Sequence, residues 1–581
     1  MNKSCANHPS IMIDLHDRVK LGMRFLDHSL DHAYGGYPNF LADFRQTPAY
    51  HIHDFADFGD LTARYWEALL LGQHMTGLKQ PDLQAKLEAN FFSYFSHPDG
   101  LSYRPVLAEP FFSQMAHRPY EPNVAEGFDQ SRVMAALITW YQLTRDGQAV
   151  SRFNRLVAGL RTKGVVKDDY LYFAQPTFRS GYTPNPDDPP YPQQLYFAQT
   201  MIKPLVQWFE LTGHEEALHT AGQLARFVTR DDGYFGQDGS FRSLQVKAPG
   251  SWDLINGHTH SRLGAVAGLL RYGRVAGDKA SMVLGRRAFD WFHRNYCLAC
   301  GWCPEFIGRY EIEKEGCETC ALMDFMDCCI ELAAAGYPEY WNPAERLLRN
   351  QLLEQQVTDA SIIPEPSTRE RAGFAKYPIG GDNVLGGFGG WCGVNDFIGN
   401  NLTGRCMMHC CGPSGIKAMV LAWQYALQAN AKVVRVNMLI PRRSAVADVQ
   451  SYDPMDGRVE VTARRPIERL EVRLPDWVDR AQVVATVANG PRPVVWQGVY
   501  VLVGAVGPGE TAVIRYPLRH VTLIEHAGRI EYQTRWIGDT VTAISPPGRD
   551  MPLYAREPFS ADAQPPQIPD YAAGIQPEPC E

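Results

Sequence analysis

Apolar residues recur at helical spacing from about residue 10 to about residue 428. Segments such as 61–75 and 131–143 place apolar side chains three and four positions apart. Several segments end in an aliphatic stretch followed by glycine, at Gly77, Gly147, Gly213, Gly277 and Gly336. A glycine there can supply the left-handed residue that closes many helices. The pattern therefore predicts about twelve helices, many of them joined in pairs by short turns.

The connections between these predicted helices are of two kinds. Short turns alternate with long loops that are rich in Pro, Tyr and Asp, such as residues 177–196. This alternation is typical of a ring of helical hairpins whose long loops build a pocket. We therefore expect an (α/α)6 barrel over residues 1–430. An open helical solenoid is the alternative, but it predicts a more regular repeat than these unequal loops show.

After about residue 430 the pattern changes to that of short strands. The strand-like segments are rich in valine and partly alternating, and they cover residues 433–441, 458–463, 470–475, 499–504 and 511–517. We expect an antiparallel β-sandwich over residues 431–525 and a β or irregular extension over residues 526–581. The predicted fold class is therefore mainly α, with a barrel domain followed by β-sandwich structure.

Composition and charge limit the kinds of partner. The chain has 581 residues, of which 45% are hydrophobic, so it can bury one very large core or several ordinary ones. Its formal charge is −8, and no Lys/Arg run is present that would bind a row of phosphates. It also lacks the apolar core of a signal peptide and any apolar stretch of about 18 residues. We expect a cytoplasmic monomer or homodimer whose partner is a small or neutral molecule, without nucleic-acid or membrane partners.

Thirteen cysteines are present, and ten of them fall in two short stretches. Seven lie in residues 297–329 and three in residues 406–411. Cytoplasmic thiols stay reduced, so an odd number of them favours metal ligands, reactive groups or core positions over disulfides. Zinc is bound tetrahedrally by thiolates, imidazoles and carboxylates. Glu318 and Cys320 at the start of a predicted helix, with Cys410 and Cys411 from a distant loop, can supply four such ligands.

Other interpretations of the cysteines stay open at this point. Cys297, Cys300 and Cys303 have knuckle spacing and could form a structural zinc site with Cys317 or Cys320. Cys328 and Cys329 lie in an apolar helical segment, where free cysteine behaves as a small hydrophobic residue. Three further cysteines carry no partner signal and are interpreted as core or surface thiols: Cys5, Cys392 and Cys580.

The motifs around these cysteines resemble those of glycoside hydrolase family 127, the β-L-arabinofuranosidase group. The resemblance rests on CETCALMD (317–324), YWNPAERLLRNQLLEQQ (340–356), HCCGPSG (409–415), VRLPDWV (472–478) and ISPPG (544–548). It covers most of residues 50–550, and it implies a catalytic (α/α)6 barrel followed by β-sandwich domains. It further implies a retaining exo-glycosidase that acts on a small carbohydrate or glycoside, with one Zn²⁺ held by Glu318, Cys320, Cys410 and Cys411. In that scheme Cys410 is also the nucleophile that attacks the anomeric carbon.

The resemblance also implies an acid/base glutamate upstream of the Glu-X-Cys element. Glu305 is the nearest match, although its spacing to Glu318 is shorter than usual, which leaves Glu311 and Glu313 as alternatives. A histidine beside the sugar corresponds to His258 or His260 in NGHTHSR (256–262), with His53 a weaker candidate. Trp391, from a long loop, is a candidate surface for stacking on the sugar ring.

Two other classes of function stay open. Another enzyme on the same barrel, such as a glycuronyl hydrolase, a lyase or an epimerase, would use loop carboxylates and histidines and leave the zinc structural. A non-catalytic carbohydrate-binding protein would bind sugar without turnover. The loops 177–196 and 377–401 do not match the family closely, so the resemblance does not carry over the exact sugar, its ring form or its linkage.

Overall fold

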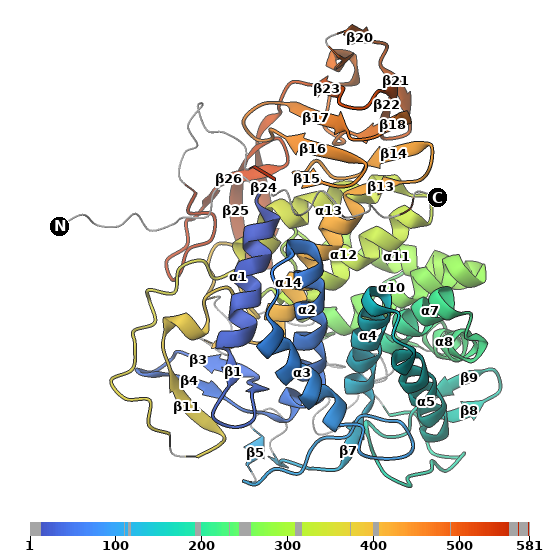
Figure 1. Ribbon diagram of the computed structural model, residues 1–581, viewed down its shortest axis with the longest axis vertical. Coiled ribbons are helices and arrows are strands. Elements are labelled where there is room, and N and C mark those ends of the chain that lie inside the picture. The colour runs from blue at the N-terminus through green and yellow to red at the C-terminus, as the bar shows by residue number, and fades with distance from the viewer. Residues whose placement is uncertain are drawn as a thin grey trace.

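The computed structural model describes most of the chain. The described residues are 13–109, 111–113, 118–191, 199–231, 233–242, 257–307, 316–371, 373–398, 406–488 and 490–556, with 567, 568 and 579. Twelve α-helices in these residues precede a set of β-sheets, which confirms the predicted fold class. In Figure 1 the helices fill the lower part of the molecule and the C-terminal strands cover its upper end.

Six of the described helices form a closed inner ring. They are α2 (Asp60–Thr76), α4 (Gly127–Thr144), α7 (Ile202–Thr212), α10 (Thr259–Ala276), α12 (Thr319–Ala334) and α14 (Cys411–Tyr425). Each packs on the next in this order, and α14 packs on α2, so the ring closes. Most residues of α2, α10 and α12 are buried, as expected for helices that are covered on every side.

A second helix packs outside each member of the ring. The outer helices are α1 (Leu15–His28), α3 (Pro81–Ser93), α5 (Gly147–Lys163), α8 (Glu215–Val228), α11 (Lys279–Tyr296) and α13 (Trp341–Leu347). They contact α14, α2, α4, α7, α10 and α12 respectively. Unlike the inner helices, α5 and α11 bury only one face. This two-layer arrangement is the (α/α)6 barrel that the alternating loops predict.

Left-handed residues close several of the inner helices. Gly77, Gly213 and Gly277 are the C-caps of α2, α7 and α10, with φ between 69° and 72°. The prediction for Gly147 is wrong, because α4 ends at Thr144 with Arg145 as its left-handed C-cap (φ 57°), and Gly147 is the first residue of α5. The sequence WYQLTRDG hides this cap because arginine rarely adopts positive φ.

Short strands also lie in the long loops of the barrel, where helical spacing gives no sign of them. A four-stranded antiparallel sheet has the order β11 (Lys376–Ile379), β4 (Ala49–Ile52), β3 (Leu41–Asp43) and β12 (Cys406–Met408). The remaining pairs are β1 (Leu30–Asp31) with β2 (Tyr37–Pro38), β5 (Phe112–Ser113) with β6 (Arg118–Pro119), β7 (Val124–Glu126) with β10 (Thr177–Arg179), and β8 (Val165–Lys167) with β9 (Tyr170–Tyr172). Strand β12 matters for function because it leads directly to Cys410.

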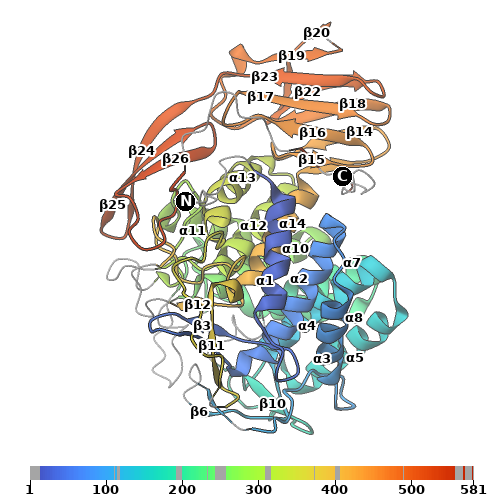
Figure 2. The same cartoon turned by 60° about the vertical axis from the view of Figure 1, so that its left-hand side comes forward.

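Two sheets follow the barrel and share a separate hydrophobic core. The first is β13 (Leu427–Ala429), β14 (Val433–Val436), β18 (Ile467–Arg473), β22 (Tyr500–Val506) and β21 (Val495–Gln497). The second is β15 (Arg442–Arg443), β16 (Ala447–Ser451), β17 (Arg458–Ala463), β23 (Thr511–Arg515), β19 (Val484–Val487) and β20 (Gly490–Arg492). Strands β14 and β18 are parallel, whereas the other pairs in both sheets are antiparallel. Figure 2 shows the two sheets as layers above the helices.

A third sheet connects the strand region to the barrel. It consists of β24 (His520–Ala527), β25 (Ile530–Ile537) and β26 (Thr540–Ser545). Its buried residues Tyr532, Trp536 and Val541 belong to the core of the barrel and not to the core of the two other sheets. In Figure 2 this sheet stands beside the layered sheets and extends toward the helices.

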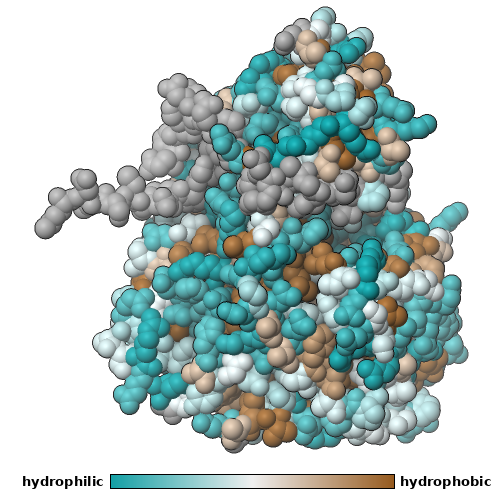
Figure 3. Space-filling view, in the orientation of Figure 1, coloured by the Kyte–Doolittle hydropathy of each residue, from teal (hydrophilic) through white to brown (hydrophobic). Residues whose placement is uncertain are grey.

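The surface is consistent with these buried cores. Hydrophilic residues cover most of the face in Figure 3, with smaller hydrophobic groups between them. None of the helices in the described residues is long and apolar enough to cross a membrane.

A buried ion pair joins the strand region to helix α13. The Arg473 guanidinium contacts Glu345 and donates a hydrogen bond of 2.5 Å to the Asn437 carbonyl. The second carboxylate oxygen of Glu345 accepts a hydrogen bond of 2.7 Å from Arg349. Arg473 and Glu345 are both fully buried, so each charge depends on its partner.

Replacing Arg473 with methionine is expected to cost about 3–5 kcal/mol, because one partner of a buried ion pair is removed. The matched control is Arg469→Met, on the same strand, whose half-exposed side chain pairs with Glu471. That change is expected to cost about 0–1 kcal/mol. Urea unfolding of both variants measures the difference, and equal shifts would show that the Arg473 pair does not stabilise the contact between the strands and the barrel.

Candidate metal centre and active site

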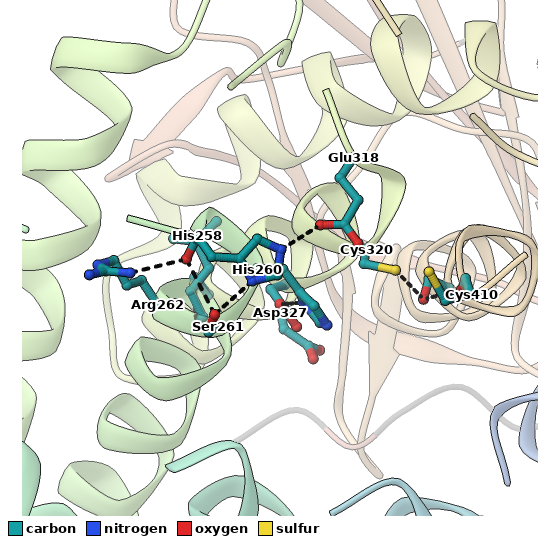
Figure 4. A network of polar contacts seen from close by, with 12 residues as sticks. His258, His260, Ser261, Arg262, Glu318, Cys320, Asp327 and Cys410 are labelled. Atoms are coloured by element: carbon teal, nitrogen blue, oxygen red, sulfur yellow. Dashed lines mark hydrogen bonds and ion pairs between the residues drawn. The ribbon is translucent and has the colours of Figure 1, made fainter. Parts of the chain in front are cut away.

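Four of the predicted metal ligands converge in the structure. The donor atoms of Glu318, Cys320, Cys410 and Cys411 all lie within 4.8 Å of one another, and all four residues are buried. Two inner helices position them: Glu318 is the N-cap of α12 and Cys320 its second residue, while Cys410 and Cys411 begin α14. In Figure 4, Glu318 and Cys320 lie between His258 on one side and Cys410 on the other.

The spacing of this cluster fits zinc. The Sγ atoms of Cys320 and Cys411 are 3.8 Å apart, far longer than a disulfide bond of about 2 Å. A Zn–S bond of about 2.3 Å places two tetrahedral thiolate ligands about 3.8 Å from each other. Three thiolates and one carboxylate form a soft donor set of the kind that zinc prefers over magnesium or calcium.

The electrostatics of the cluster also favour a cation. Burial opposes ionisation of Cys320, but hydrogen bonds from the Cys410 and Cys411 thiols and the charge of Arg64 hold its pKa well below the ordinary value. The hydrogen bond with Cys320 raises the pKa of Cys410, and burial together with Cys320 raises the pKa of Cys411. The protein alone therefore favours one thiolate among the three. A divalent cation would displace the remaining protons.

A second group of donors shares Glu318 with the first. Donor atoms of His258, Glu305 and Glu318 lie within 4.8 Å of one another, and all three residues are buried. His258 Nε2 is 3.1 Å from the Glu318 carboxylate, and its Nδ1 is 2.7 Å from the Ser261 hydroxyl. The predicted metal ligands and the predicted acid/base glutamate thus lie next to each other, and the Glu318 carboxylate is common to both groups.

Backbone hydrogen bonds hold Glu305 beside this group. Its N–H donates to the Gly316 carbonyl over 2.8 Å, and its carbonyl accepts from the Thr259 N–H over 2.8 Å. The alternatives Glu311 and Glu313 lie outside the described residues. Of the three glutamates considered, Glu305 is the one whose position the structure describes, and it lies beside Glu318.

His260 lies in a different environment from His258. Its Nδ1 contacts the Asp324 carboxylate, and its Nε2 faces Arg132 at 2.8 Å and Arg64 at 3.3 Å. Both ring nitrogens are therefore engaged by charged groups in the barrel. Of the two candidate histidines, His258 is the one that lies beside Glu305 and Glu318.

Arg64 links this charged group to the thiols. Its guanidinium donates to Cys320 Sγ over 3.5 Å, to Ser414 Oγ over 2.9 Å and to the Asp60 carboxylate over 2.5 Å. Arg64, Arg132 and Asp324 were not among the predicted site residues. Their one signal in the sequence is a charged residue within an otherwise apolar helical segment, and that signal does not say where the side chain points.

The two remaining residues predicted to contact the sugar, His53 and Trp391, lie in different surroundings. His53 is buried with Nδ1 at 2.7 Å from Asp57 and Nε2 at 3.0 Å from Asp31, and its ring stacks on Phe374. Both nitrogens are occupied, so its surroundings do not support a sugar contact. Trp391 is half-buried, and its backbone lies so close to Gly316 that a Cβ there would be 2.7 Å from it. Trp391 is therefore placed next to the segment that leads into Glu318.

The described residues give no support to a separate zinc site at the knuckle-spaced cysteines. Cys297, Cys300 and Cys303 are absent from the groups of three or more potential ligands among the described residues. Cys320, one proposed fourth ligand, belongs to the other cluster. Cys328 and Cys329 are fully buried in α12, as the core interpretation expects. The described cysteines are all free thiols.

Comparison with known proteins supports the fold. No protein-family model matches the chain, and no curated protein sequence matches it. Its structure is similar to a family 127 β-L-arabinofuranosidase from Geobacillus stearothermophilus T6, with a TM-score of 0.59 and 13% identity over 90% of this chain and 80% of that one. A second family 127 β-arabinofuranosidase gives 0.58 and 14%, over 90% and 78%. A third structure, described as a glycoside hydrolase, gives 0.56 and 14%, over 87% and 82%.

These similarities define the class of fold. At 13–14% identity they show that this fold is shared over most of each chain. What the chain does with the site has to be argued from its own residues.

Replacing Arg64 with glutamine is expected to weaken zinc binding about 10–100-fold, because residues that hydrogen-bond to metal ligands contribute about this much. The matched control is Arg132→Gln, which removes a neighbouring guanidinium that also contacts His260. Among the hydrogen bonds of the described residues, Arg132 donates none to a thiol. Competition with a chromophoric chelator measures both affinities, with circular dichroism as the check on folding. Equal affinities for the two variants would contradict the role of Arg64.

Proposed function

We propose that the protein is a retaining exo-glycoside hydrolase, similar to β-L-arabinofuranosidases, in which Cys410 is the nucleophile and Glu305 the acid/base. One observation carries this proposal: Glu318 belongs both to the thiol cluster and to the group that contains Glu305. A retaining enzyme needs its nucleophile and proton donor close together, about 5–5.5 Å apart when both are carboxylates. A shared neighbour brings the two candidates into one buried site.

Exposure distinguishes Cys410 from the other two thiols. Cys410 retains 5% of its surface, whereas Cys320 and Cys411 have 0%. A substrate carbon can therefore approach Cys410 more readily than either neighbour. Cys320 is held by Arg64 and Ser414, which suits a fixed ligand.

The bound zinc would be held by Glu318, Cys320, Cys410 and Cys411, and it would keep the thiols deprotonated at neutral pH. Without such a partner a free thiol is mostly protonated, since its ordinary pKa is about 8.5. Helices α12 and α14 begin at these residues, and positive helix N-termini favour thiolates.

The two steps follow from these positions. Cys410 Sγ attacks the anomeric carbon while the bond to the leaving oxygen breaks and the Glu305 carboxyl gives that oxygen its proton. Glu305 then takes a proton from water, whose oxygen attacks the anomeric carbon and releases the Cys410 thiolate. His258 contacts Glu318 and so holds in place the carboxylate that belongs to both donor groups.

The test is the release of aryl alcohol from a panel of aryl glycosides, led by the β-L-arabinofuranoside. We expect turnover of that substrate by the zinc-loaded protein and its loss after treatment with a strong chelator. New ultraviolet absorbance from a double bond would indicate a lyase, and sugar binding without turnover would indicate a carbohydrate-binding protein. Either result would reject the proposed hydrolase.

A further inference from the structure

His258, Glu305 and Glu318 form a compact set of nitrogen and oxygen donors outside the thiol quartet. Each retains between 3% and 5% of its surface, and one donor atom from each lies within 4.8 Å of the other two. An imidazole and two carboxylates are ligands that zinc accepts in catalytic sites. Buried acidic groups of this kind need a proton, a positive side chain or a cation beside them.

The distances suit a metal ion. His258 Nε2 and the Glu318 carboxylate oxygen are 3.1 Å apart. Zinc binds nitrogen and oxygen at about 2.0–2.2 Å, which places two ligands of one ion about 3.0–3.5 Å from each other. Glu318 has two carboxylate oxygens, so it can offer one to the thiol site and the other to this site.

We propose that His258, Glu305 and Glu318 form a second, weaker site for a borderline divalent cation such as Zn²⁺, bridged to the thiol site by Glu318, and that a cation held there inhibits the enzyme. The binding site stands on the geometry alone, whereas the inhibition rests on the proposed role of Glu305. A cation bound to the Glu305 carboxylate occupies the oxygen that would otherwise carry the proton for the leaving group.

The chemistry of the donors sets the order of filling. Three thiolates make the first site the stronger one for zinc, whereas the second site has one imidazole and two carboxylates, one of them shared. Magnesium and calcium prefer sites made wholly of oxygen donors, so they are poor occupants of a site that contains an imidazole. Zinc is therefore expected to fill the thiol site first and the second site only at higher free concentration.

The experiment measures zinc content and hydrolysis together over a series of buffered free zinc concentrations. We expect wild-type protein to bind one equivalent tightly and a second equivalent at higher zinc, with inhibition that follows the second. His258→Gln and Glu305→Gln are expected to keep the first equivalent and to weaken the second at least about tenfold. The matched control is His293→Gln, which removes a half-buried histidine of α11 outside both donor sets.

The outcomes separate the two proposals. A single equivalent at every zinc concentration would overturn the second site, as would a second equivalent that persists unchanged in both variants. A second equivalent without inhibition of an active enzyme would overturn its inhibitory role. If the second equivalent behaves as expected but no glycoside is hydrolysed, the metal site stands and the proposed hydrolase falls.

Discussion

Cys410→Ala is expected to lower kcat/KM for the aryl β-L-arabinofuranoside by about 10⁴-fold or more, since removing a catalytic nucleophile typically has effects of this size or larger. Alanine has no atom that can form the bond to the anomeric carbon. The neighbouring Cys411 cannot replace Cys410 because it is fully buried. Steady-state kinetics with wild type and variant side by side measure the loss.

Cys410 is also a proposed zinc ligand, so loss of metal has to be separated from loss of the nucleophile. Cys411→Ala is the matched control, because it removes one thiol from the same cluster and leaves Cys410 in place. With zinc added to saturation, we expect Cys411→Ala to lose far less activity than Cys410→Ala. Zinc content and thermal unfolding are measured for both variants. Equal residual activity at equal zinc content would exclude Cys410 as the nucleophile.

Glu305→Gln is expected to affect substrates according to their leaving groups. General acid catalysis contributes about 10²–10⁴-fold, and it matters most when the leaving oxygen needs a proton. A dinitrophenyl glycoside, whose leaving group departs as an anion, is expected to lose less than about tenfold in its first step. An alkyl glycoside or a disaccharide is expected to lose the full amount.

The measurement is the slope of log kcat/KM against the pKa of the leaving group. We expect a shallow slope for wild type and a steep one for Glu305→Gln, together with loss of the alkaline limb of the pH profile. A uniform loss for all substrates would mean that Glu305 positions the site and does not donate the proton. Glu311 and Glu313 would then be the next variants to measure.

The barrel and the thiol cluster were predictable because their signals are local. Burial on every side of a helix shows as an apolar segment such as 321–335, and Gly213 and Gly277 close helices where their sequence places them. The convergence of the four proposed ligands was also predicted, since Glu318 with Cys320 and Cys410 with Cys411 form two pairs, each at the start of one helix. Because the four residues come as two pairs, the cluster forms once the starts of two helices meet.

The charged group around His260 was not predictable in the same way. It joins Arg64 of α2, Arg132 of α4 and Asp324 of α12, and His260 lies 196 positions from Arg64. Such contacts depend on which inner helices face each other, and helical spacing alone does not determine this. The strands of the small sheet were missed because three or four residues are too few to show alternation.

The pairing of ligands from α12 and α14 has a consequence for the synthesis of the protein. Cys320 and Cys411 are separated by 91 positions. At about 5–20 residues per second, the ribosome makes the second pair of ligands about 5–18 seconds after the first. During that interval the nascent chain carries only two of the four ligands. Stable uptake of the proposed zinc would therefore coincide with the docking of α14 between α12 and α2, so metal loading would report on the completed ring.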